Sequence, residues 1–184
     1  MGLWDDEPAP ARSGFLRFAD FFRDPDDIRP GEIGRLLLIK PLASGEREST
    51  LQGQQGKLYP WVECDIAILD GPPSEIIEEV PFVYEGFQFS GATLTGILLP
   101  KLRTGGTVLG RASAHKSKGF NTLGWGLEKP TPADFEMAKA FQRTMQERER
   151  AKEQATIRTQ QATDPWSGPP GNERQDAAPP WVRQ

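Results

Sequence analysis

The chain has 184 residues and a formal net charge of -4 at pH 7, and 36% of its residues are hydrophobic. This length suits one domain of ordinary size plus tails, and the hydrophobic share is low for a chain that is packed throughout. A single cysteine, Cys64, excludes an intramolecular disulfide and a cysteine-based zinc cluster. Because no apolar run resembles a membrane span or a signal peptide, we expect a cytoplasmic protein without membrane contact.

Residues 1–30 are interpreted as an N-terminal arm, polar apart from one aromatic cluster. Phe15, Phe18 and Phe22 fall at positions i, i+3 and i+7, which predicts a short helix that docks on the core. The turn residues Pro30 and Gly31 then end the arm.

Residues 31–130 alternate short apolar runs with turn residues, a pattern typical of strands. The expected strands are 33–42, 58–69, one or two within 75–89, 107–115 and 122–129. A polar stretch at 43–56 is expected to be a long loop, and 116–121 a basic loop. A short helix is expected within 90–102, which Pro100 should end.

The clearest strand is 58–69, where apolar and polar residues alternate. Alternate residues of a strand point to opposite faces, so one face of this strand should enter the core. The residues expected to face the core are Val62, Cys64, Ile66 and Ile68, and those expected to face away are Tyr59, Trp61, Glu63 and Asp65.

Five short strands with a helix between the third and fourth predict a mainly β fold with helices. The specific expectation is a five-stranded OB-type barrel, residues 31–130, although other folds can share this order of elements.

The segment 131–163 carries the best helix signals in the chain. Thr131 suits the N-cap, Pro132 the first helical position, and Asp134 lies three residues after the cap. An apolar stripe follows, formed by Phe135, Ala138, Phe141 and Met145. Beyond the stripe the helix should be polar all round, and the Pro/Gly-rich tail 164–184 should be disordered.

Residues suited to catalysis are not brought together by the sequence. His115 is the only histidine, it lies beside Lys116, and no acid is near it in the chain. The acids do not have the spacing of a calcium loop, and no phosphate-binding glycine loop is present. We therefore expect a protein that is not an enzyme and needs no metal or cofactor, with a carboxylate-dependent hydrolase as a weaker alternative.

Charge is strongly segregated along the chain. Residues 101–129 hold six bases and one acid, a net +5, whereas residues 61–85 hold seven acids and no base. Basic tracks neutralise phosphates and exposed rings stack on bases, so basic and aromatic residues together favour single-stranded nucleic acid over plain solvated surface. Tyr59 and Trp61 lack an obvious core role, whereas Trp125 alternates with leucines and can equally pack inside.

Two sets of contact residues are expected on this basis. The residues expected to bind nucleic acid are Arg35, Lys40, Tyr59, Trp61, Lys101, Arg103, Arg111, His115, Lys116, Lys118, Phe120 and Trp125. The tail residues expected to bind a partner protein are Asp164, Pro165, Trp166, Pro179, Pro180 and Trp181, since tryptophans after prolines suit capture in a groove.

The order of a VLGR strand, a basic glycine-containing loop, an aromatic strand and the helix PTPADFEMAKAF resembles single-stranded-DNA-binding proteins of phages that infect actinobacteria, over about 31–145. The DPW motif of the tail resembles the tail of bacterial single-stranded-DNA-binding proteins. The resemblance implies an OB fold that coats single-stranded DNA during phage replication and recombination, in the host cytoplasm. It also implies that Arg111, Lys116 and Lys118 face the DNA and that the tail binds replication or recombination proteins.

A protein-interaction or assembly module, acting through the C-terminal helix and the tryptophan-containing tail, is the alternative function. A homo-oligomer is compatible with either function, and the sequence does not decide the oligomeric state.

Overall fold

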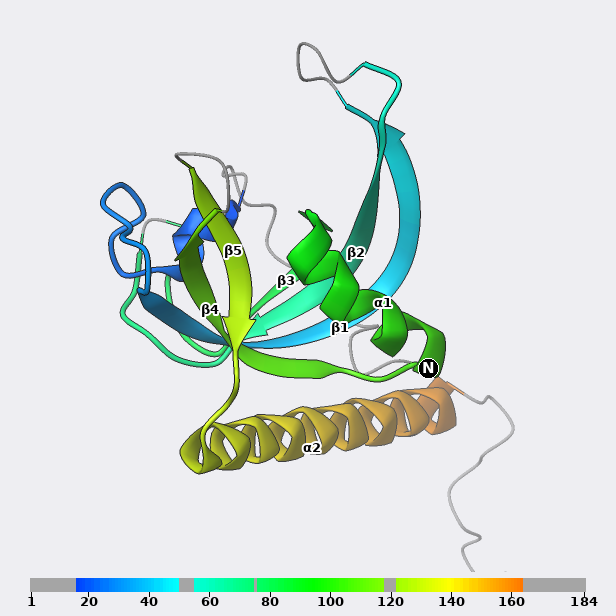
Figure 1. Cartoon of the computed structure of the whole chain (residues 1–184). Helices are drawn as coiled ribbons and strands as arrows, with labels where there is room; N and C mark the ends of the chain where they lie inside the picture. Colours follow the sequence, from blue (N-terminus) through cyan, green and yellow to red (C-terminus); the bar gives the residue numbers. More distant parts are fainter. Residues whose placement is uncertain (1–15, 50–54, 75, 118–121, 164–184) are drawn as a thin grey trace, which may run out of the picture. The chain divides into compact units, whose positions relative to one another are not determined.

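The computed structural model describes residues 16–49, 55–74, 76–117 and 122–163 (Figure 1). The chain divides into two compact units, Met1–Thr144 and Met145–Gln184. The first unit contains one five-stranded antiparallel sheet, as the sequence predicts. Its strands are β1 (Ile33–Glu48), β2 (Leu58–Ile68), β3 (Phe82–Ser90), β4 (Val108–Lys116) and β5 (Leu123–Glu128).

The strand order is β3-β2-β1-β4-β5, so β3 and β5 are the two edges of the sheet. Within the described residues no pairing joins these two edges, and the sheet is therefore open rather than closed into a barrel. Two helices complete the fold, α1 (Ala92–Thr104) between β3 and β4 and α2 (Pro132–Thr163) after β5. Figure 1 shows α1 lying between the β1–β2 and β4–β5 hairpins, and it contacts β1, β2, β3 and β5.

The alternation predicted for the second strand is confirmed. Val62, Cys64, Ile66 and Ile68 are fully buried in the core. Burial also raises the pKa of the Cys64 thiol to about 12, with the neighbouring acids adding to the effect. Trp61, Glu63 and Asp65 alternate with these residues and therefore point to the opposite face of the sheet.

The aromatic cluster of the N-terminal arm packs into the core between the two sheet edges, in agreement with the predicted docking. It forms a short 3-10 helix, η1 (Phe18–Phe21), followed by Phe22. The ring of Phe18 lies 6.0 Å from that of Phe89 on β3 and 5.1 Å from that of Trp125 on β5. The aromatic side chains of η1 thus connect two strands that the backbone does not. Phe15 lies outside the described residues.

Strand β1 continues six residues beyond the predicted 33–42, to Glu48. The prediction of a loop from 43 onward is therefore wrong for 43–48. This part of β1 has no apolar face because it pairs only with β2 and has little core to cover. Period-2 hydrophobicity reports burial on one face, so a strand exposed on both faces leaves no such pattern.

Helix α1 continues past Pro100, which was predicted to end it. Proline lacks an N–H and so loses the bond to the carbonyl of Gly96, but only four residues follow it in the helix. Gly105 then ends the helix in the left-handed conformation, and its N–H caps the carbonyls of the last turn.

The predicted start of α2 is confirmed atom by atom. The Thr131 hydroxyl accepts a hydrogen bond from the Asp134 N–H at 3.3 Å, and the Asp134 carboxylate accepts one from the Thr131 N–H at 2.8 Å. This reciprocal pair is a capping box. Of the predicted apolar stripe, Ala138 and Phe141 are buried, but Phe135 is 49% exposed.

The second unit contains the rest of α2. Its described side chains from 146 to 159 are exposed, as expected for a helix that is polar all round. Among the described residues, no helix combines the length and the apolar character needed to cross a membrane.

Candidate nucleic-acid interface

The β1–β2 pair extends beyond β4 as a projecting hairpin, formed by 43–48 and 58–63, and its outer half also extends beyond β3 (Figure 1). β4 pairs with β1 only from Ile33 to Ile39, and β3 reaches β2 only as far as Trp61. The far half of the hairpin is therefore two strands wide. Both of its faces are free of other strands, so residues on either face can meet a partner.

One face of the projecting hairpin combines cations with aromatic rings. The strand register places Arg47 opposite Tyr59 and Gly45 opposite Trp61. Directly opposed residues of an antiparallel pair lie on the same face. Lys57, two residues before Tyr59, continues the alternation onto that face. We call these five residues, Gly45, Arg47, Lys57, Tyr59 and Trp61, the hairpin face.

The indole ring of Trp61 lies across the backbone of Gly45. A Cβ placed on Gly45 would come within 2.6 Å of the Trp61 ring, so a larger residue at this position would require the ring to move. The glycine therefore lets the ring lie flat against the strand rather than stand away from it. Trp61 is partly exposed, so part of its ring is open to a partner, as a stacking residue requires.

The opposite face of the projecting hairpin carries acids instead. Glu46 pairs with Pro60 and Glu48 pairs with Leu58, and both glutamates are exposed. Arg47 and Lys57 on one face and Glu46 and Glu48 on the other give the hairpin a difference in charge across its thickness, although Glu63 also lies on the aromatic face, nearer the rest of the sheet. A polyanion would therefore be attracted to the outer part of the aromatic face.

The outward surface of the sheet continues from the hairpin face toward the centre of the first unit. Gln88 donates a hydrogen bond to the Glu63 carboxylate at 3.3 Å, and Lys40 lies opposite Asp65 in the register. Asp65 is buried and accepts a bond from the Gly86 N–H. Lys40 therefore lies on the same face of the sheet as the hairpin face, and Glu63 is the unfavourable charge there.

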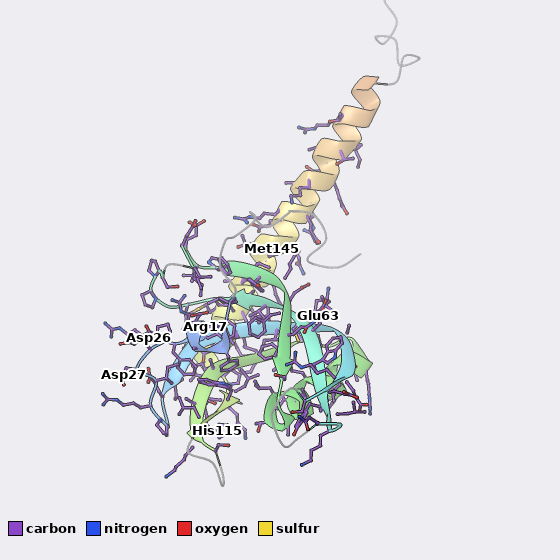
Figure 2. The ribbon with its side chains drawn as sticks, turned by 90° about the horizontal axis from the view of Figure 1, so that it is seen from above. Arg17, Asp26, Asp27, Glu63, His115 and Met145 are labelled. Carbon is purple, nitrogen blue, oxygen red and sulfur yellow. The ribbon has the colours of Figure 1, made fainter. Side chains whose placement is uncertain are left out.

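A second group of predicted residues lies at the end of β4. Figure 2 shows His115 and Glu63 on separate parts of the sheet. The His115 imidazole lies over Gly124 of β5, where an added Cβ would meet its Nε2 at 2.4 Å. His115 and Lys116 border an open groove of about 580 Å³, which Glu32 and Glu128 also line. This mixture of charges suits a polyanion less well than the hairpin face.

Three residues predicted to bind nucleic acid, Arg35, Trp125 and Arg111, have partners within the protein. Arg35 is 4% exposed, and its guanidinium donates to the Pro72 carbonyl. Burial lowers the pKa of Arg35. The Trp125 ring packs against the rings of Phe18 and Phe22, at centroid distances of 5.1 and 5.7 Å. The alternation of Trp125 with leucines in the sequence therefore reflects packing in the core. These side chains have interior partners that a polynucleotide cannot reach.

Arg111 is the third, and its guanidinium is held by two carboxylates. Nη1 donates to Asp70 at 2.8 Å, while Nε and Nη2 donate to Asp134 at 3.1 and 2.5 Å. Hydrogen bonding to Asp134 raises the pKa of Arg111, and the same bonds hold the pKa of Asp134 below its usual range. The arginine thus connects β4 to the first turn of α2, and we assign it to the fold rather than to the interface.

The remaining predicted residues fall into two sets. Lys101 and Arg103 are exposed in the last turn of α1, just before β4 begins. His115 and Lys116 lie at the other end of β4. The basic stretch is therefore divided between the two ends of one strand. Lys118, Phe120 and the tail residues Asp164, Pro165, Trp166, Pro179, Pro180 and Trp181 lie outside the described residues.

Sequence reasoning missed Arg47, which it assigned to the loop 43–56, and Lys57, which it placed in neither that loop nor the strand 58–69. The available signal was their spacing from the aromatic strand. Arg47 follows Gly45 by two residues and Lys57 precedes Tyr59 by two, which is the alternation of a continuing hairpin. The register that puts the two cations on one face with Trp61 was not visible in the sequence.

Within the described residues, no group of three or more histidine, cysteine, aspartate or glutamate side chains could hold a metal ion. Comparisons with protein families, with curated proteins and with solved structures found no match for this chain.

Proposed function

We propose that this protein binds single-stranded DNA without strong sequence preference, and that the hairpin face is its main contact surface. The observation that carries the proposal is the register of the projecting hairpin, which places Arg47, Tyr59 and Trp61 on one face, and the alternation of the strand extends that face to Lys57. Cations neutralise phosphates of any sequence, and every base has a face on which a ring can stack. Neither interaction reads base identity.

The fold supports the proposal in a second way. An OB fold is a partly open five-stranded barrel that binds oligonucleotides on strands 2 and 3 and on the loops after strands 1 and 4. The present sheet is open between β3 and β5, has its helix between β3 and β4, and projects its hairpin between β1 and β2. We propose that the first unit is an OB-type barrel whose remaining gap is filled by the aromatic rings of η1.

The decisive experiment is a salt titration of oligo-dT affinity by fluorescence anisotropy. Each neutralised phosphate contributes about -0.7 to the slope of log affinity against log salt for single strands. Replacing both Arg47 and Lys57 with alanine should therefore make the slope shallower by about 1.4 and weaken binding of every sequence.

The opposite face provides a matched control. Changing Glu46 and Glu48 together to glutamine alters two charges on the same strand but leaves the hairpin face intact. This variant should keep the wild-type salt slope. An affinity that is flat in salt, or equal for duplex DNA, would contradict the proposal.

Trp61→Ala tests the stacking component separately. It should weaken binding by about 1–3 kcal/mol per stacked base and leave the salt slope unchanged, because stacking releases few ions. A parallel titration with oligo-rU compares RNA with DNA through the same residues.

A further inference from the structure

A groove lies on the outward side of the first unit, between the start of α2 and the start of β4. Its volume is about 450 Å³. One wall is α2, through Phe135, Ala138 and Lys139, and the floor contains Leu38 of β1. The lining residues combine an apolar centre with two lysines, Lys101 and Lys139, and include no acid.

Phe135 is the unusual residue of this groove. It is the first residue of the predicted apolar stripe of α2, yet half of its surface is exposed, whereas Ala138 and Phe141 are buried. No aromatic ring partner is found for Phe135 among the described residues, although eight other ring pairs surround the core. Its ring therefore has a free face beside a cationic rim.

The cations of the rim are available to an anion. Lys139 is paired with Glu136 at 2.8 Å, but both side chains are more than half exposed and such pairs are weak. Lys101 is exposed in the last turn of α1 and has no ion pair within the described part of the chain. The groove thus complements a phosphate next to an apolar ring.

The groove lies in line with the hairpin face along one surface of the sheet. The residues of β2 on this face run from Ala67, which is opposite Leu38 in the groove lining, to Trp61, which is opposite Gly45. At about 3.3 Å per residue, these six steps cover about 20 Å. Ala67 and Asp65 are buried, whereas Lys40 of β1 is partly exposed, so a DNA strand that joins the two ends would pass over Lys40. Lys40 lies between the two ends on the same surface.

We infer that the groove is a second base-binding subsite for the same DNA strand, in which Phe135 stacks on a base and Lys101 contacts a neighbouring phosphate. The inference rests on the proposed function and extends it, because it predicts a path along β1 and β2 from the hairpin face to α2. A short oligonucleotide reaches only the hairpin face, and a longer one occupies both subsites.

The test compares two lengths of oligo-dT, about 4 and about 16 nucleotides, which bracket the usual site size of one OB fold. Phe135→Ala should weaken binding of the long oligonucleotide at least about fivefold, which corresponds to the low end of the free energy of one base–ring stack. Binding of the short oligonucleotide should be unchanged. Lys101→Ala should make the salt slope shallower by about 0.7 for the long oligonucleotide only.

Met137→Ala is the matched control, since Met137 is an exposed apolar residue of the same helix that does not line the groove. It should bind both lengths like the wild type. Thermal unfolding should give similar midpoints for all three variants, because each removed side chain is at least partly exposed.

The outcomes separate the inference from the proposed function. If Phe135→Ala leaves the long oligonucleotide unaffected while Trp61→Ala weakens both lengths, the groove is not a subsite and the proposed function stands. Equal losses for Phe135→Ala and Met137→Ala also overturn the inference, because they would reflect α2 in general. If the wild type binds neither length, both the inference and the proposed function fail.

Discussion

Replacing Arg111 with alanine should destabilise the fold without weakening DNA binding by the molecules that remain folded. Arg111 joins three segments that are distant in sequence: β4, the turn after β2 that holds Asp70, and the first turn of α2 that holds Asp134. The Asp134 side chain is 1% exposed and takes two hydrogen bonds from the guanidinium. Without the arginine, this carboxylate stays buried with the Thr131 N–H as its remaining donor.

Removing one partner of a buried ion pair costs about 3–5 kcal/mol, because the other charge is left uncompensated. The side chains of Arg111 and Asp70 are 25% and 22% exposed, so water can enter the space that the arginine leaves. We therefore expect the low end, a loss of about 3 kcal/mol in the free energy of unfolding. For a chain of this size that corresponds to a fall of about 6–12 °C in Tm.

Urea denaturation followed by circular dichroism measures this loss, and oligo-dT anisotropy well below the unfolding midpoint measures binding. Arg103→Ala is the control, since this arginine is exposed at the end of α1 and should change stability by about 0.5 kcal/mol or less. A normal unfolding midpoint for Arg111→Ala, together with a large loss of DNA affinity, would refute the structural role and return Arg111 to the interface.

Four further outcomes are expected. Arg111 lowers the pKa of Asp134, so the stabilisation from this ion pair should be complete above about pH 4, the pKa of an aspartate in the unfolded chain, and should be lost as the pH falls through the lower pKa of the folded state. In Asp134→Asn, the midpoint of urea unfolding should therefore change less with pH across this acidic range. Trp125→Ala should cost about 3 kcal/mol of stability, the low end for a partly buried aromatic residue, and calorimetry should show it. Cys64, fully buried with a pKa near 12, should react with thiol reagents only after denaturation. Glu63→Gln should tighten oligo-dT binding, more at low salt than at high salt, whereas unchanged affinity would place the DNA elsewhere.

Several elements of the fold were predictable because their signals are local. The burial of alternate residues in β2 follows from the pleat of a strand, and the start of α2 follows from hydrogen bonds between Thr131 and Asp134, three residues apart. The docking of Phe18 and Phe22 was visible as a helical spacing of large aromatic rings. The signal for each of these features lies within a few residues of the chain, although the partners of Phe18 and Phe22, Phe89 and Trp125, are distant in sequence.

The candidate site could not be read in the same way, because the role of a charged side chain depends on what the tertiary structure places opposite it. Arg111 and Arg47 look alike in the sequence, since each follows a glycine by one or two residues. The fold brings Asp70 and the buried Asp134 to Arg111, whereas the register of β1 and β2 sets Arg47 beside Tyr59 on an open face. Ion pairing and strand register join residues that are far apart along the chain, and the Arg111 guanidinium is therefore bound by two carboxylates of the fold while that of Arg47 remains available to a partner.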